Sequence, residues 1–232
     1  MAIAANEEQK RPTCVGFIMD GNRRWAKAQG KPPTAGHLAG EQVFYESIGW
    51  LQALAIAHGV YYAFSTENWQ RSEEEIAYLQ ELFVSFLKRT IPEIKAKGIR
   101  IRIIGNRTDF SPELQKLIAT AEAEGAPTAS PTVWVALSYG GRAEILAAVN
   151  QAVRAGVDVD EVAFTKLLWS NEMPDPDLII RTGGEQRLSN FLTWQSVYSE
   201  LYFTDTYWPD FTEEEFRRIL DWYATRERRR GR

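Results

Sequence analysis

The chain has 232 residues, a formal net charge of −4 at neutral pH and one cysteine, Cys14. A single cysteine excludes an intramolecular disulfide, and with two histidines the chain offers no zinc-ligand cluster. The acidic balance argues against a general affinity for nucleic acid, although Arg226, Arg228, Arg229, Arg230 and Arg232 lie among the last seven residues. No signal peptide and no apolar stretch of roughly 20 residues is present, so we expect a cytoplasmic protein, at most peripheral at the membrane.

Strands and helices are predicted to alternate along the chain. Residues 1–12 form a polar lead that we expect to be disordered. Apolar runs predict strands at 15–19, 60–64, 99–104, 132–137, 178–180 and 201–203. Helical spacing predicts helices at 22–29, 40–58 with Gly59 as its C-cap, 72–98 with a kink or restart at Pro92, 111–125, 145–153, 158–169 and 212–223. This alternation predicts an α/β fold over residues 13–232: a single domain with a mostly parallel central sheet flanked by helices.

The first predicted strand leads into an acid, a glycine and two arginines. Open α/β sheets bind ligands at such strand-to-helix junctions. The free N–H groups of a helix start favour an anion, Arg23 and Arg24 add donors, and Asp20 can hold a divalent cation that the anion shares. The pattern favours a phosphate or diphosphate ester. The alternative is an N-capping aspartate before a solvated basic helix.

Four predicted strands end in polar loops, at residues 20–24, 65–71, 138–142 and 181–189. Carboxyl ends of parallel strands share one edge of a sheet, so we expect these loops to converge. Gly183 and Gly184 would let backbone N–H groups approach an anion, beside further donors from Arg181 and Arg187, which indicates a second phosphate site. Two sites imply two phosphorylated substrates. No Walker loop or dinucleotide motif supports a nucleoside triphosphate or NAD.

The motifs of the chain are IMDGNRRWA, the Gly36-His37 pair, YAFSTENWQR, RIIGNRTDFSPELQ, YGGR, DLIIRTGGEQRLSNFL and ELYFTDTYWPDF. In this order, from Gly16 to Gly231, they resemble the cis-prenyltransferases, the undecaprenyl diphosphate synthase family. The resemblance implies a Mg²⁺-dependent homodimer that joins isopentenyl diphosphate to an allylic prenyl diphosphate. The product would be a Z-polyprenyl diphosphate, with diphosphate released. A hydrophobic tunnel is also implied, and the aromatic-rich helix of Phe83 and Phe86 is a plausible wall.

The resemblance also assigns roles to residues. Asp20 and Asn68 would be catalytic, Asn68 by helping to remove a proton. Mg²⁺ would bind Asp20 and Glu200, with Glu200 either from the same chain or from the partner subunit. The closing Arg229-Arg230-Gly231 resembles a segment that reaches the other subunit's active site. The allylic diphosphate is expected to bind Gly21, Asn22, Arg23, Arg24, Trp25 and His37. Asn68 would be supported by Ser65, Thr66, Glu67, Trp69 and Arg71. Isopentenyl diphosphate is expected to bind Arg181, Arg187, Leu188 and Ser189. From the residues alone, His37 is equally compatible with a structural role.

Four positions depart from the family pattern: Arg23 replaces a glycine of many bacterial members, Pro33 a diphosphate-binding arginine, Ser72 a proline and Ser138 an asparagine. Two alternatives therefore stay open, an irregular condensation of two allylic diphosphates on the same scaffold and a non-catalytic accessory subunit. The sequence does not specify the allylic primer, the downstream pathway or the product length.

Product length has one candidate determinant. Strand alternation puts Tyr61 on the face of Ser65, and Trp134 on the face of Ser138. The two rings would then form a floor of the tunnel that stops elongation early. The alternative is that they are ordinary core residues.

Overall fold

The structure, a computed structural model, describes residues 11–227, apart from the side chain of Lys95. Its residues group into two compact units. Of the described residues, the first unit contains those up to Gly59, those from Asp175 to Arg187 and those from Gln195 onward. The second unit contains residues 60–174 and 188–194. Each unit is described by itself below.

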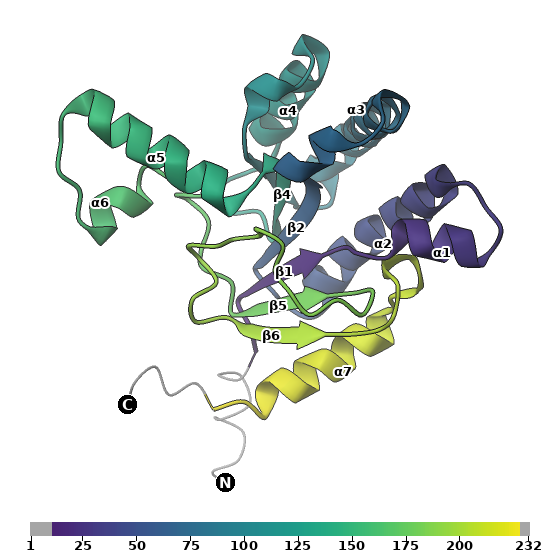
Figure 1. The fold of residues 1–232 in the computed structure, drawn as a ribbon. Helices are drawn as coiled ribbons and strands as arrows, with labels where there is room; N and C mark the ends of the chain where they lie inside the picture. Colours follow the sequence, from purple (N-terminus) through teal and green to yellow (C-terminus); the bar gives the residue numbers. More distant parts are fainter. Residues whose placement is uncertain (1–10, 228–232) are drawn as a thin grey trace, which may run out of the picture. The chain divides into compact units, whose positions relative to one another are not determined.

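The first unit is built on three parallel strands, β1 (Cys14–Ile18), β5 (Leu178–Arg181) and β6 (Glu200–Phe203), which are hydrogen-bonded in that order (Figure 1). The register aligns Ile18 with Arg181 and Arg181 with Phe203. All five residues of β1 are buried, as expected for a strand of a parallel sheet that is covered on both faces. The helices of this unit are α1 (Asn22–Ala28), α2 (Pro33–Ala53), the 3₁₀ turn η4 (Trp208–Asp210) and α7 (Glu213–Ala224).

Helix α2 differs from the prediction at both ends. It begins at Pro33, seven residues before the expected start, because proline is well suited to the first position of a helix, where its missing N–H would have no partner. It ends at Ala53, so the prediction of Gly59 as its C-cap is wrong. Gly59 instead lies within the following strand.

Aromatic side chains fill the core of the first unit. The Phe17 ring of β1 lies 6.1 Å from the Trp208 ring and 5.6 Å from the Phe216 ring of α7. Trp208 stacks on Phe211, and its indole N–H donates to the Gly40 carbonyl at 2.8 Å. Because Trp208 is only 1% exposed, this hydrogen bond satisfies a donor that would otherwise be buried without a partner.

The second unit contains most of β2 (His58–Ser65), with β3 (Arg100–Ile104) and β4 (Thr132–Tyr139). The strand order is β3-β4-β2, and β3 and β4 are parallel. All predicted strands are present, within two residues at each end. The helical elements here are η2 (Thr66–Gln70), α3 (Glu73–Ala96), η3 (Arg107–Asp109), α4 (Pro112–Glu124), α5 (Gly141–Ala155) and α6 (Glu161–Thr165).

Serine hydroxyls cap two helix starts in the second unit, at the residues where those helices were predicted to begin. Ser72 accepts from the Glu75 N–H at 3.3 Å, and Ser111 accepts from the Leu114 N–H at 3.3 Å. Helix α3 continues through Pro92 without a restart, and α6 is shorter than predicted. Within the part of the chain that the structure describes, no helix combines the length and the apolar character that a membrane crossing requires.

Candidate active site

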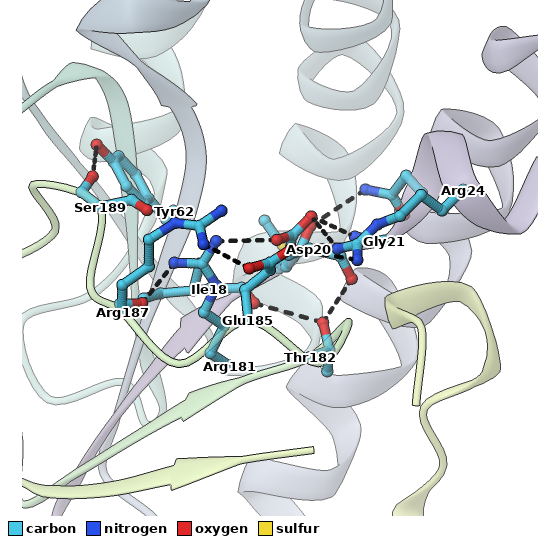
Figure 2. Close-up of polar contacts among 12 residues, drawn as sticks. Ile18, Asp20, Gly21, Arg24, Tyr62, Arg181, Thr182, Glu185, Arg187 and Ser189 are labelled. Carbon is cyan, nitrogen blue, oxygen red and sulfur yellow. Dashed lines mark hydrogen bonds and ion pairs between the residues drawn. The ribbon is translucent and has the colours of Figure 1, made fainter. Parts of the chain in front are cut away.

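The carboxylate of Asp20 lies at the centre of a charged cluster in the first unit. Asp20 follows β1, and Arg181 is the last residue of the neighbouring β5. Their side chains form an ion pair of 2.9 Å, and Arg24 approaches the other oxygen of Asp20 at 3.1 Å (Figure 2). The Arg181 side chain is only 5% exposed, so this carboxylate supplies a partner that a buried guanidinium requires.

Glu185 extends the cluster into a closed ring. Its carboxylate lies 3.6 Å from Arg24 and is also paired with Arg187. The Arg187 backbone carbonyl in turn accepts from the Arg181 guanidinium. Three arginines and two carboxylates therefore make up the ring, in which Arg181 and Arg187 are neighbours, and Figure 2 shows their connections. Because the positive charges outnumber the negative ones, the ring can accept an additional anion.

Gly21 allows this ring to form at the start of α1. It has a φ of +106°, and a side chain there would bring a Cβ within 2.6 Å of the Tyr207 ring. The Gly21 N–H donates to Asp20 at 2.6 Å, and the Arg24 guanidinium lies 5.5 Å from the centre of the Tyr207 ring. Gly21, not Asp20, is the N-cap of α1 and has no side-chain cap bond, so the alternative of a capping aspartate is wrong.

The predicted anion contacts of Gly183 and Gly184 are also wrong. Their N–H groups donate to the carbonyls of Thr206 and Thr204, each at 2.8 Å. These donors are therefore occupied by backbone. Gly183 has another use, because a Cβ there would lie 2.7 Å from the Arg24 guanidinium.

The remaining residues of the predicted allylic site have separate contacts. Trp25 donates to Asp210 at 2.7 Å, and Asn22 donates to the Met19 carbonyl at 3.2 Å. Arg23 is exposed. Gly36 packs against the Asn22 carbonyl so closely that a Cβ at position 36 would clash with it. This close packing places the backbone of the next residue, His37, beside the start of α1. The expected phosphate contact of His37 stays a prediction.

Glu200 lies far from Asp20 within one chain. It begins β6, where the register aligns it with Leu178 and, through Leu178, with Val15. Asp20 is five residues beyond Val15, which is roughly 16 Å along the strand direction. Glu200 is paired instead with Arg226 at 3.0 Å. The two predicted metal ligands of one chain therefore cannot share an ion, and residues 11–227 contain no group of three potential metal-ligating side chains. Arg229, Arg230 and Gly231 lie outside the described residues.

In the second unit, the turn that follows β2 carries Asn68. The Ser65 N–H donates to the Asn68 side-chain oxygen at 3.1 Å, and the Ser65 hydroxyl accepts from the Asn68 N–H, which forms a capping box. This fixes the orientation of the Asn68 amide and leaves its NH₂ group as the donor for other contacts. The Trp69 indole N–H donates to the Ser138 hydroxyl at 2.8 Å. The Arg71 guanidinium donates to the Glu75 carboxylate at 2.9 Å.

Asn190, which the sequence did not single out, connects three loops of the second unit. Its amide donates to Glu67 at 2.9 Å and accepts from the Arg142 N–H at 2.9 Å. Its backbone carbonyl accepts from Gly141 at 2.8 Å. Burial raises the pKa of Glu67, but hydrogen bonds from Asn190, the Glu67 backbone, Ser65 and Thr66 outweigh burial and lower that pKa below 4.5. Glu67 is therefore an ionised acceptor at neutral pH.

The segment that contains Leu188 and Ser189 is held in a strained conformation. Ser189 and Asn190 have φ values of +48° and +68°, uncommon for residues with a side chain. The Tyr62 hydroxyl donates to the Ser189 carbonyl at 3.3 Å (Figure 2). The Tyr62 ring stacks on Phe191 with a centroid distance of 4.7 Å. The Leu188 carbonyl accepts from the Phe191 N–H at 3.0 Å. Packing and hydrogen bonds on both sides of Ser189 therefore fix this segment.

The whole chain is similar to known prenyltransferases. A sequence profile described as "putative undecaprenyl diphosphate synthase" matches residues 18–231. An isoprenyl transferase of Ralstonia nicotianae is 42% identical, over 99% of this chain and 91% of that protein. A ditrans,polycis-undecaprenyl-diphosphate synthase of Aliivibrio fischeri, described as specific for (2E,6E)-farnesyl diphosphate, is 43% identical over 95% of this chain and 88% of that protein.

A solved structure of lavandulyl diphosphate synthase from Lavandula x intermedia, in complex with dimethylallyl diphosphate, superposes with a TM-score of 0.92. The two sequences are 33% identical, and the superposition covers 97% of this chain and 100% of the lavandulyl diphosphate synthase chain. The predicted single-domain α/β fold, with a parallel sheet flanked by helices, is therefore confirmed. With a profile that matches almost its entire length, this chain belongs to the undecaprenyl diphosphate synthase family of prenyltransferases.

Proposed function

We propose that this chain catalyses cis-prenyl chain elongation. Isopentenyl diphosphate condenses with an allylic prenyl diphosphate, which gives a Z-polyprenyl diphosphate and releases diphosphate and a proton. One observation carries the proposal: the ring that joins Arg24, Arg181 and Arg187 to two carboxylates at the carboxyl ends of β1 and β5. A site that holds developing diphosphate charge needs such a set of preorganised cations.

Breaking the allylic C–O bond leaves a cationic prenyl fragment and a diphosphate. Each preorganised donor that contacts the departing oxygens is typically worth ~10²–10³-fold in rate. Arg24, with Gly21 and Arg23 at the start of α1, holds the allylic diphosphate in this proposal. Arg181, Arg187 and Ser189 hold isopentenyl diphosphate. Glu185 contacts both Arg24 and Arg187, so it lies between the two proposed subsites.

Asp20 is the proposed protein ligand for Mg²⁺. Mg²⁺ is often bound by one or two carboxylates, with substrate phosphates and water as the other ligands. The Asp20 carboxylate, which lies beside diphosphate-binding arginines, fits that donor set. The bound ion would neutralise charge on the departing diphosphate. Because Asp20 is paired with Arg24 and Arg181, metal binding would release both arginines toward the diphosphates.

Asn68 assists proton removal as a donor in this proposal. Its side-chain oxygen is bonded to Ser65, and a neutral amide is not a base. Glu67 has a lowered pKa, which makes it a weak base at neutral pH. We therefore assign to the Asn68 NH₂ group the role of orienting a diphosphate oxygen near the proton that leaves isopentenyl diphosphate.

The growing chain requires an apolar tunnel that excludes water from the cationic fragment. The proposed wall is α3, where Phe83 is half-buried and meets the Phe64 ring at a centroid distance of 6.1 Å. Phe86, one turn further, is 7% exposed.

A homodimer is also proposed. Leu146, Val149 and Val153 follow helical spacing on α5 and are 61%, 41% and 73% exposed, which leaves an apolar stripe for another surface. The separation of Glu200 from Asp20 along the strands supports the same arrangement, because Glu200 can reach an active site only in a second subunit. Light scattering on the purified protein should give twice the mass of one chain. A monomer with full activity would contradict this proposal.

Irregular condensation of two allylic diphosphates is a second candidate, favoured by the likeness to lavandulyl diphosphate synthase. Incubation with labelled isopentenyl diphosphate and an allylic primer separates the two. Cis-elongation incorporates the label, whereas irregular condensation consumes the allylic substrate alone. A non-catalytic accessory subunit would do neither, and the presence of Asp20, Asn68, Arg181 and Arg187 argues against it.

A further inference from the structure

Ser138 is a fully buried residue with an unusual backbone conformation at the end of β4. Its φ is +46°, in the left-handed region that residues with a side chain rarely adopt. Such a conformation persists only where surrounding contacts determine it, and such positions cluster at functional sites. None of the roles proposed above uses Ser138.

The loop that follows β3 holds Ser138 in place. The Ser138 carbonyl accepts from the Asn106 N–H at 3.2 Å. The Ser138 hydroxyl donates to Asp109, and Asp109 accepts from the Asn106 amide at 2.7 Å. Gly105 makes this approach possible, because a Cβ at that position would clash with the Leu137 carbonyl. The hydroxyl proton of Ser138 is therefore directed at Asp109, and its lone pairs remain free to accept.

The group that donates to Ser138 is the indole of Trp69. The Trp69 N–H lies 2.8 Å from the Ser138 hydroxyl oxygen. The Trp69 ring packs edge-on against Phe64 at 4.9 Å and lies 5.5 Å from Phe110. These contacts fix Trp69 from both its polar and its apolar sides. Trp69 directly follows Asn68 in the five-residue η2 turn, so its placement determines where Asn68 can lie.

We propose that Ser138 is a positioning residue, which, through Trp69, fixes the turn that presents Asn68 to the substrates. The inference rests on the proposed function only for the role of Asn68. A hydroxyl can accept from the indole and donate to Asp109 at the same time. Asparagine can do both through its amide, and it tolerates positive φ better than other residues with side chains. Ser138→Asn should therefore preserve the arrangement.

Ser138→Gly is the sharpest variant, because it removes the hydroxyl while glycine accepts the positive φ without strain. Its kcat should fall about ten- to hundredfold, as expected for a misplaced catalytic group, with each KM changed less than about threefold. Ser138→Asn should restore kcat to within about threefold of wild type. Trp69→Phe should lower kcat like Ser138→Gly, and the double variant should lose little more because both act through one hydrogen bond. Ser47→Ala, which removes another fully buried serine hydroxyl, is the control and should keep the wild-type kcat.

Amide hydrogen exchange of residues 65–71 supplies a readout that does not depend on turnover. Ser138→Gly should accelerate exchange in this segment, and Ser138→Asn should not. Wild-type kcat and wild-type exchange in Ser138→Gly would overturn the inference. If the wild-type protein fails to incorporate isopentenyl diphosphate, the proposed function is lost. In that case hydrogen exchange alone still decides whether Ser138 holds the turn.

Discussion

The Asp20 carboxylate and the Arg181 guanidinium, 161 residues apart in sequence, form a 2.9 Å ion pair where two parallel strands end side by side. Arg181 is almost completely buried and Asp20 is partly exposed. The carboxylate therefore has two uses in our account: it neutralises a buried arginine, and it offers an oxygen to a metal ion at the surface of the cluster. Removing Asp20 affects both.

Asp20→Ala should lose at least about a thousandfold in kcat, because metal placement and two arginine positions depend on this side chain. The free energy of unfolding should fall by about 3 kcal/mol, because the buried Arg181 guanidinium loses its carboxylate partner. Asp20→Asn, which keeps the shape and removes the charge, should be similarly inactive. The checks are steady-state rates and thermal unfolding. Near-wild-type turnover in either variant would refute the catalytic assignment.

Arg187→Ala should raise the KM for isopentenyl diphosphate far more than the KM for the allylic primer. The backbone contact of Arg187 with Arg181 survives this change, so only the guanidinium is removed. Arg24→Ala is the matched variant and should raise mainly the KM for the primer. Initial rates with each substrate varied in turn test the pair. Equal effects on both substrates would show that the two subsites have been divided wrongly.

Glu67 should make stability depend on pH in acid. Its pKa in the folded state is below the ordinary value of 4.5, so its contribution is complete above pH 4.5 and is lost as pH falls through the folded pKa. The difference in Tm between wild type and Glu67→Gln should therefore shrink from about pH 5 to about pH 3. Asn190→Gly, which keeps the positive φ but removes one donor, should show part of the effect. A difference that stays constant over this range would contradict the assignment.

Tyr61 and Trp134 are 0% and 4% exposed, which fits a tunnel floor and an ordinary core position equally. If they form a floor, Tyr61→Ala or Trp134→Ala should extend the product, because a smaller side chain opens space for further isoprene units. Chromatography that resolves chain length, with one primer and all three proteins, makes the comparison. Unchanged product lengths in both variants would end this idea.

Local patterns predicted the elements and the first contact of the site. The helix starts at Ser72 and Ser111 could be predicted because a capping serine and its N–H partner are three residues apart. The proximity of Asp20 and Arg181 followed from the rule that parallel strands place their carboxyl ends together. The start of α2 at Pro33 was missed, because a proline can end one helix and also suits the first position of the next.

Partner choice within the loops could not be predicted. The donors of Gly183 and Gly184 are consumed by Thr206 and Thr204, a pairing between segments about twenty residues apart with no local pattern. Glu185, Asn190 and Tyr207 were missed for the same reason. Each of these residues can be identified only from the folded structure, because its contacts depend on how the loops pack together and not on the spacing of residues in the sequence.

The geometry of the new double bond tests the central claim most directly. Wild-type protein, Mg²⁺, an allylic primer and ¹³C-labelled isopentenyl diphosphate should yield products in which NMR shows every added unit to be labelled and in the Z configuration. Asp20→Asn under the same conditions should yield none. Products without label, with a branched linkage or with E double bonds would contradict cis-elongation by this chain.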